Sequence, residues 1–318
     1  MKLILTISLI AYSAIVYSQN YTFSPSWKKG EKKTLSIEYN EKEFSNNKLI
    51  LDTTYFNKAS IEVLNEKSED YTIQIIYPNQ GMRKAMELYE DLGKEFDAYK
   101  DLKLKYAINK KSGAADLINW KEVQSFITLG FDKIKNAVDG KGSSMNSMDL
   151  IFKPIMEIFS TKENIEAYMY DHIYYMLIPY NDSFTVGDTL VKTEIEENPF
   201  NPNMECSSTT RLLLDSYDQS KNECHFIEQT EIDLDEFVET MKMMMRQMTK
   251  SMGVDDSTAM KKINEIDNFM MDMEMINSIN YNTESTWVTK IVEKRNVSAT
   301  RKNGKFTRKE VTKTTIIK

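Results

Sequence analysis

Histidine, cysteine, proline and glycine are all scarce in this sequence. Its 318 residues include only 2 His, 2 Cys, 6 Pro and 10 Gly. So few histidines leave little room for histidine-based catalysis or for a zinc site. The low glycine and cysteine contents exclude a collagen-like chain and a disulfide-stapled miniprotein, and the 41% hydrophobic content excludes a wholly disordered one.

Positive charge is outnumbered as well, with 41 Lys and Arg against 48 Asp and Glu. The net charge of -7 argues against nucleic acid as the main partner. The sequence also lacks the GxSxG, Walker, Rossmann-glycine, HExxH and CxxC motifs. What it has in abundance is methionine, with 20 residues, and a length sufficient to bury a sizeable core.

The first eighteen residues have the pattern of a secretory signal. Lys2 supplies a positive charge, and the stretch from Leu3 to Val16 is uncharged and mostly apolar. Val16-Tyr17-Ser18 then offers a cleavage site, so we predict removal after about Ser18. An uncleaved N-terminal anchor is the alternative. Since no later stretch has eighteen apolar residues in a row, we expect no transmembrane span in the mature chain and a periplasmic or extracellular location.

Export to an oxidising compartment raises the possibility of a disulfide between Cys206 and Cys224. Two strands predicted around the turn at 218–222 place Ser216, and not Cys206, opposite Cys224. Cys206 would then lie about ten residues away, roughly 33 Å at strand rise. A disulfide needs Cα atoms within about 7 Å. Bridging therefore requires Cys206 to leave the strand, and two unpaired thiols are the alternative.

Hydrophobic periodicity predicts strands near both ends of the chain and helices between them. Strands are expected at 33–39, 47–54, 58–65, 70–77, 188–196, 207–217, 223–232, 273–281, 285–300 and 305–317. Turns are expected at Asn46-Asn47 and at Asn57. Helical insertions are expected at about 120–178 and 233–271. The predicted fold class is α+β: residues 19–318 form one domain, with a large curved antiparallel sheet built from the N- and C-terminal strands.

Several short phrases, spread over most of the mature chain, carry a resemblance. They are Tyr106 to Gly113 with Leu117 to Val123, Ile178-Pro-Tyr-Asn with Val186-Gly-Asp188, Asn198-Pro-Phe200, and Thr283-Glu-Ser-Thr-Trp287. In this order they resemble a group of uncharacterised exported proteins of Bacteroidetes-type bacteria. The resemblance implies an envelope location and a β-rich body, and it brings no catalytic residues. More loosely, a curved sheet with helices against it is similar to lipoprotein-carrier folds.

Eleven of the methionines lie between 241 and 275. On a helix from Asp233 to Met252 several share one face, which continues back through Phe237. Core packing accounts for this face, a groove for an apolar ligand or partner is the functional alternative, and a Cu(I) site is a third reading. The residues that would form the groove are Phe237, Met241, Met244, Met245 and Met248.

The final hairpin is basic. From Lys290 to Lys318 it carries ten Lys or Arg and only two Glu. Such a surface either faces anions, such as lipid headgroups, or is a solvated face whose lysines block edge-to-edge pairing. The residues that would face anions are Arg301, Lys302, Lys305, Arg308 and Lys309.

His172 and His225 lie far apart in the sequence and have no companions at metal-ligand spacing, so a structural role is expected for each. The sequence predicts an exported envelope protein that is not an enzyme, needs no cofactor or metal and binds an apolar or amphipathic ligand. Its expected partners are lipid or another envelope protein. A structural or interaction protein without a small ligand is the alternative. A hydrolase with dispersed catalytic residues ranks third, and a Ser or Asp converging on either histidine in a pocket would support it.

Overall fold

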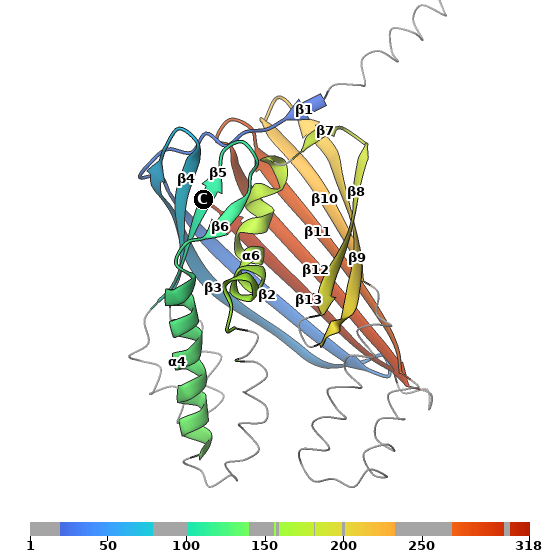
Figure 1. The fold of residues 1–318 in the computed structure, drawn as a ribbon. Helices are drawn as coiled ribbons and strands as arrows, with labels where there is room; N and C mark the ends of the chain where they lie inside the picture. Colours follow the sequence, from blue (N-terminus) through green and yellow to red (C-terminus); the bar gives the residue numbers. More distant parts are fainter. Residues whose placement is uncertain are drawn as a thin grey trace, which may run out of the picture.

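The computed structural model describes residues 20–78, 101–139, 156, 159–180, 182–198, 201–232, 269–301 and 306–318. Within these residues, eleven strands form a single antiparallel sheet in the order β6-β5-β4-β3-β2-β13-β12-β11-β10-β9-β8. Figure 1 shows this sheet curling around helix α6, so that it has a concave face and a convex face. The strands are β2 (Lys32–Ser45), β3 (Lys48–Glu66), β4 (Asp70–Tyr77), β5 (Leu102–Asn109), β6 (Ala115–Leu117), β8 (Thr189–Asn198), β9 (Asn201–Asp218), β10 (Glu223–Ile232), β11 (Phe269–Asn282), β12 (Trp287–Arg301) and β13 (Phe306–Ile317).

Two further strands, β1 (Asn20–Thr22) and β7 (Ser183–Thr185), pair with each other in a small separate sheet. The segment after β1 then runs across one end of the large sheet towards β2 (Figure 1). Gly30, at φ +85°, ends this crossing and donates its N–H to Val63 O at 2.8 Å. Positive φ is open to glycine at little cost, which lets the chain turn into β2 here.

Alternation of apolar and polar residues explains the strands near the middle of the sheet. In β4, the buried side chains Tyr71, Ile73 and Ile75 alternate with less buried neighbours, as predicted for 70–77. The predicted turn at Asn46-Asn47 is confirmed, with φ of 49° and 61°. The predicted turn at Asn57 is wrong, because this residue lies inside β3 and pairs with Ile37. Pairing with β2 on one side keeps the strand extended there.

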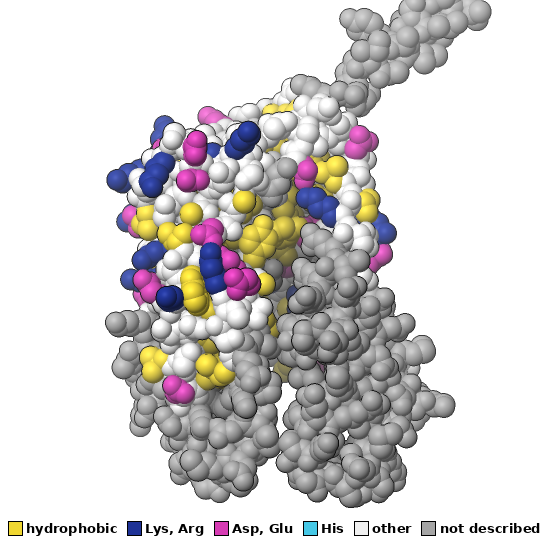
Figure 2. All heavy atoms as spheres, viewed as in Figure 1, with side chains coloured by type: hydrophobic (Ala, Val, Ile, Leu, Met, Phe, Trp, Pro, Cys, Tyr) yellow, Lys and Arg dark blue, Asp and Glu magenta, His cyan; other side chains and the backbone are white. Residues whose placement is uncertain are grey.

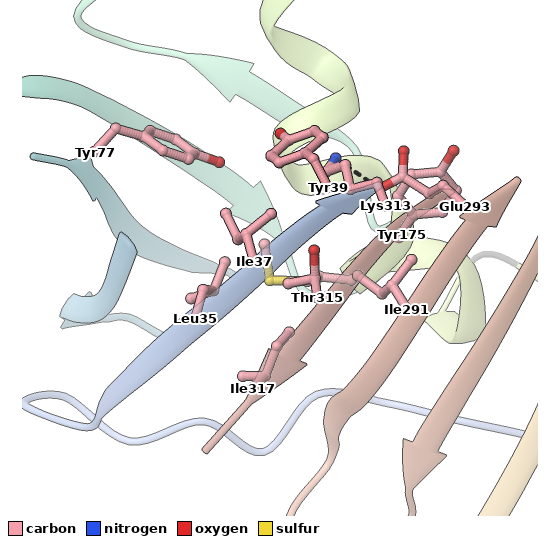
Figure 3. A pocket seen from close by; sticks show the side chains of 11 residues that line it. Leu35, Ile37, Tyr39, Tyr77, Tyr175, Ile291, Glu293, Lys313, Thr315 and Ile317 are labelled. Carbon is pink, nitrogen blue, oxygen red and sulfur yellow. Dashed lines mark ion pairs between the residues drawn. The ribbon is translucent and has the colours of Figure 1, made fainter. Parts of the chain in front are cut away.

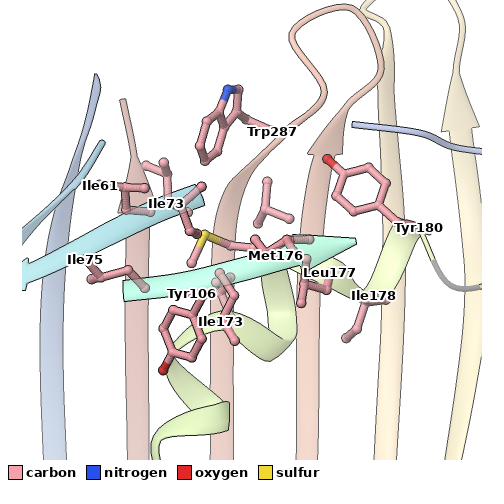
Figure 4. Close-up of a cluster of buried hydrophobic side chains, with 14 of the residues drawn as sticks. Ile61, Ile73, Ile75, Tyr106, Ile173, Met176, Leu177, Ile178, Tyr180 and Trp287 are labelled. Carbon is pink, nitrogen blue, oxygen red and sulfur yellow. The ribbon is translucent and has the colours of Figure 1, made fainter. Parts of the chain in front are cut away.

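Three helical elements are described: α4 (Trp120–Asp139), α6 (Lys162–Leu177) and the 3₁₀ turn η1 (Ile178–Tyr180). Thr161 caps α6 by accepting a hydrogen bond from Asn164 N. Tyr106 on β5 donates its hydroxyl to Met169 O at 2.6 Å, which fastens α6 to the sheet. Figure 4 shows the end of α6 and η1 packed among buried sheet residues, including Ile73 and Ile75.

The predicted α+β class is wrong, because the described chain is largely β with a single large antiparallel sheet. Within the expected insertion at 120–178, α4, α6 and η1 are helical, and they lie on a sheet that accounts for most of the described residues. Most of the expected insertion at 233–271 lies outside the described residues. Its last part, Phe269 to Met271, is strand rather than helix, since it pairs with Ala299 to Arg301 on β12. Strand pairing here overrides the helical propensity of methionine.

An aromatic cluster closes the end of the sheet that the N-terminal segment crosses. Trp27 and Trp287 stack with ring centroids 4.6 Å apart, and both are almost fully buried. Trp27 Nε1 donates to Thr286 O at 2.8 Å, and Trp287 Nε1 donates to Glu31 Oε1 at 2.8 Å. Each buried indole N–H thus has an acceptor, as a dry core requires. We call this cluster the closed end; its members are Phe23, Trp27, Tyr180, Tyr281 and Trp287.

Candidate functional site

A row of polar side chains crosses the concave face in register. Direct Cα partners along the ladders connect six strands, from β10 to β3. Residues directly opposite each other in an antiparallel ladder project on the same face. The row therefore lies on one side of the sheet. Its members, in order, are Glu228, Asn277, Glu293, Lys313, Tyr39 and Tyr55.

The neighbouring row towards the closed end is mainly apolar. It consists of Phe226, Ile279, Ile291, Thr315 and Ile37, again as direct Cα partners. All five of these side chains are buried. The polar row is therefore a boundary at which the apolar core stops, and not a scatter of isolated polar residues.

One end of the polar row is deeply buried under α6. Glu228 and Asn277 are each only 3% exposed. Tyr174 of α6 donates its hydroxyl to Glu228 Oε2 at 2.7 Å, and Asn277 Nδ2 donates to Glu228 Oε1 at 2.9 Å. A buried carboxylate is stable only with such donors. Burial, with the Glu228 charge beside it, raises the pKa of Tyr174 far above its usual value, so the hydroxyl keeps its proton.

The middle of the row opens into a small pocket between α6 and the sheet. Its volume is about 40 Å³, which is room for a small polar group or a few water molecules. Figure 3 shows aliphatic side chains, such as Leu35 and Ile317, at one end and the polar row at the other. Lys313 Nζ lies 2.6 Å from Glu293 Oε1, and both side chains keep about a quarter of their surface exposed. The pocket is therefore amphipathic and carries one charge of each sign.

Two tyrosines beside this ion pair remain neutral hydrogen-bonding groups. Burial raises the pKa of Tyr77 well above its usual range, and Tyr39 and Glu293 raise it further. Burial likewise raises the pKa of Tyr39, against the opposing effect of Lys313. The Tyr39 ring also stacks on Tyr55, with centroids 4.9 Å apart. The charge of the pocket is thus set by Glu293 and Lys313 alone among its lining residues.

Beyond the polar row, away from the closed end, β11, β12 and β13 present further apolar side chains on the same face. They are assigned to this face by the two-residue alternation of the strands. They are Met273, Met275, Val297, Ala299 and Val311, all buried or half-buried. Two exposed cations lie among them on this face: Arg295, opposite Met275 and Val311, and Lys309, opposite Val297. Figure 2 shows hydrophobic side chains gathered at the hollowed centre of this side of the molecule. An amphiphile could place its polar end at the row and its chain along these residues.

The sequence-predicted ligand residues, Phe237, Met241, Met244, Met245 and Met248, lie outside the described residues. Among the predicted anion-facing residues, Lys302 and Lys305 also lie outside them, and for Arg301 only the backbone, at the end of β12, is described. Arg308 pairs with Glu310, at 2.9 Å between Nε and Oε1. Lys309 pairs with Glu41 at 2.6 Å and with Glu43 at 3.5 Å. These two cations are therefore matched by carboxylates of the protein itself.

The two cysteines lie on different strands of the large sheet. Cys206 lies on β9 opposite Glu196, and Cys224 lies on β10 opposite Tyr217. Cys224 is a free, buried thiol. Burial raises its pKa to about 12, so the reactive thiolate is suppressed at neutral pH.

His225 lies on the convex face in a chain of three hydrogen-bonding side chains. A β-bulge beside it places Asp215 Oδ2 3.0 Å from His225 Nδ1, and Ser278 Oγ lies 2.7 Å from His225 Nε2. These are the contacts of a Ser-His-Asp triad. However, the backbone N–H groups around Ser278 belong to the ladders with β10 and β12, so they cannot form an oxyanion hole. Asp215 is also 44% exposed, so water reaches the group. The geometry therefore fits a structural cross-strand contact better than a hydrolase.

No helix in the described part of the chain combines the length and apolar character that a bilayer crossing requires. Nor does the described part contain a cluster of three or more His, Cys, Asp or Glu side chains that could hold a metal ion.

Comparison with known proteins yields neither a matching protein-family model nor a matching curated protein. Two solved structures are similar over 92% of this chain. One is a structure of lipid-protein interactions in lipovitellin, with a TM-score of 0.37 and 7% identity, and this chain spans 25% of its length. The other is Ail, the attachment invasion locus protein of Yersinia pestis, with a TM-score of 0.15, 6% identity and 100% of its length covered. Both TM-scores are too low to establish a common fold.

Proposed function

We propose that this chain is an exported, non-enzymatic protein of the cell envelope that binds an amphipathic ligand on the concave face of its sheet. The observation that carries the proposal is the polar row, which crosses the concave face between an apolar core and a second stretch that is partly apolar. Each buried polar side chain needs a hydrogen-bonding partner, whereas an apolar side chain at the same position would need none. A row that is aligned across six strands and opens into a pocket is suited to hold a polar end group.

Binding would be driven by the chain of the ligand and oriented by the row. Apolar surface contributes about 25 cal/mol per Å² when it is removed from water. The half-buried side chains of β11–β13 beyond the row, such as Met275 and Val297, supply that surface. The signal-like N-terminal sequence and the absence of catalytic motifs support an exported binding protein.

Neighbouring threonines on β13 provide a matched test. Thr315 is 4% exposed and lines the pocket, whereas Thr314 projects on the opposite face. The uncharged fluorescent probe N-phenyl-1-naphthylamine should bind the purified protein saturably and be displaced by monolaurin. Thr315→Leu fills the pocket and should weaken monolaurin binding about tenfold, while Thr314→Leu should leave it unchanged.

Mass spectrometry of the purified native protein should in addition identify a co-purifying lipid. If no lipid is found and neither the probe nor monolaurin binds saturably, the proposal is wrong and an interaction protein without a small ligand is favoured. Thermal unfolding of both threonine variants shows whether a loss of binding reflects a loss of folding.

A further inference from the structure

The Glu293–Lys313 pair has an unusual feature for a resident ion pair. The Nζ and Oε1 atoms are 2.6 Å apart, yet Oε1 is buried and accepts no hydrogen bond of good geometry from any described residue. Buried carboxylate oxygens normally have a hydrogen-bond donor, and each exception calls for an explanation. The Lys313 ammonium neutralises this oxygen at 2.6 Å without a well-directed hydrogen bond, so a ligand N–H group with better geometry can take its place.

Both charges of the pair line the same small pocket, together with the hydroxyl-bearing residues Tyr39, Tyr77 and Thr315. Figure 3 shows Lys313, Glu293 and Tyr175 together at the polar end of the pocket. An anionic end group would be attracted by Lys313 but repelled by Glu293. A simple cation would be attracted by Glu293 but repelled by Lys313. An end group with both charges is complementary to the two residues at once.

We infer that the pocket recognises a zwitterionic end group, in which a primary ammonium binds Glu293 and an adjacent anion, such as a phosphate, binds Lys313. This inference rests on the proposed function, because the pocket takes up only part of the end group and the chain of the amphiphile lies along β11–β13. A primary ammonium is favoured over a quaternary one because it has N–H groups to donate to Glu293 Oε1.

Exchange of the resident pair for the ligand is energetically reasonable. A partly exposed ion pair contributes little to stability, so opening it costs little. The exchange replaces one contact by two charge-assisted contacts, and each residue keeps a partner of opposite charge throughout. No buried charge is therefore left unpaired in the bound state.

Four amphiphiles that share a lauroyl chain and a glycerol unit test the inference. They are the lysophospholipids with ethanolamine, choline and glycerol end groups, and monolaurin. Each displaces N-phenyl-1-naphthylamine from the purified protein below its critical micelle concentration. The ethanolamine lipid should bind about tenfold more tightly than each of the others.

Variants then locate the preference. Glu293→Gln and Lys313→Gln should each abolish it, whereas the charge-swapped double variant E293K/K313E should keep it. Lys309→Gln is the control, because Lys309 lies on the same strand and face but pairs with Glu41; this variant should keep the preference.

The outcomes separate the two proposals. Equal affinities for all four amphiphiles, or tightest binding of the anionic glycerol lipid, would overturn the zwitterion inference and leave the proposed function standing. Failure of all four to displace the probe would overturn the proposed function itself. If a variant does not fold, the comparison of the four ligands on the unsubstituted protein still decides whether the ethanolamine end group is preferred.

Discussion

The closed end and the polar row lie on the same sheet but satisfy their polar groups in opposite ways. At the closed end, Thr286 O accepts from Trp27 and from the Tyr180 hydroxyl, and the rings around these groups exclude water. In the polar row, Glu293 and Lys313 rely on each other and remain partly exposed. The first arrangement suits stability and the second suits exchange with a ligand. The difference indicates that fully buried, hydrogen-bonded polar groups and partly exposed, charged ones lie in separate parts of the same sheet.

The largest effect is expected at the closed end. Trp27→Ala removes a fully buried indole and its stacking partner for Trp287, and should lower the free energy of unfolding by about 3–5 kcal/mol. Denaturant unfolding measures this loss. Tyr168→Ala, at a tyrosine that is 47% exposed, is the control and should change stability by less than about 1 kcal/mol. Similar losses in the two variants would show that the closed end does not dominate stability.

The buried end of the polar row should have an intermediate effect. Glu228→Ala leaves the Tyr174 hydroxyl and the Asn277 amide without their acceptor, which should cost about 1–3 kcal/mol. Glu231→Ala, on the same strand, breaks only an exposed pair with Arg211 and should cost at most about 1 kcal/mol. Equal costs measured by chemical unfolding would contradict the buried role of Glu228.

Alkaline pH should destabilise the fold, in part through Tyr281 of the closed end and its direct strand partner Cys224. Burial raises the pKa of Cys224 from 9.0 to about 12, and that of Tyr281 from 10.0 to about 12. Between about pH 9 and pH 12 these groups are deprotonated in the unfolded chain but keep their protons in the folded chain. The free energy of unfolding is therefore unaffected by them below pH 9 and decreases as pH rises towards 12. Each such proton contributes a slope of up to about 1.4 kcal/mol per pH unit. Cys224→Ala should flatten the slope that begins near pH 9, and an unchanged slope in unfolding titrations would count against this assignment.

The exposed middle of the row should affect binding rather than stability. Lys313→Met should change the free energy of unfolding by at most about 1 kcal/mol, because the pair it breaks is partly exposed. The same variant should lose its preference for the ethanolamine lipid. A large loss of stability instead would mean that the row, like the closed end, serves the fold.

The smallest effect is expected on the convex face. Ser278→Ala removes the hydroxyl that contacts His225, and the rate of p-nitrophenyl acetate hydrolysis measured with this variant should equal that measured with the unsubstituted protein. The reason is that the backbone around Ser278 offers no free oxyanion donors. If the unsubstituted protein releases nitrophenol and Ser278→Ala does not, the hydrolase hypothesis would be supported again.

Alternation in the sequence was sufficient to locate most strands but not their full length. The strand at 70–77 was predicted with its observed bounds. The sequence-based prediction divided strand β3 at Asn57, because the turn propensity of a short segment carries no information on the pairing of this residue with Ile37. The strand predicted at 273–281 is confirmed within β11, but the first residues of β11, Phe269 to Met271, were assigned to a helix. In both places a partner strand distant in sequence decided the conformation.

The candidate site left a weak signal that was missed. In β10, β11 and β12, a polar residue occupies the inward position next to a buried apolar one: Glu228 after Phe226, Asn277 before Ile279, and Glu293 after Ile291. A single polar residue on an inward face predicts little, because turns, bulges and surface positions produce the same pattern. Only knowledge of the registers shows that these residues are neighbours.

By itself the sequence determined the position of most strands, a signal-like N-terminus, few histidines and no recognised catalytic motif; the α+β class drawn from it was wrong. These properties depend on composition and on patterns spanning a few residues, which local chemistry governs. The tertiary structure alone decided that Glu228, Asn277, Glu293, Lys313, Tyr39 and Tyr55 form one row. Residues from position 39 to position 313 meet there because antiparallel registers over six strands bring them together, and register is a property of strand pairs and not of any one segment.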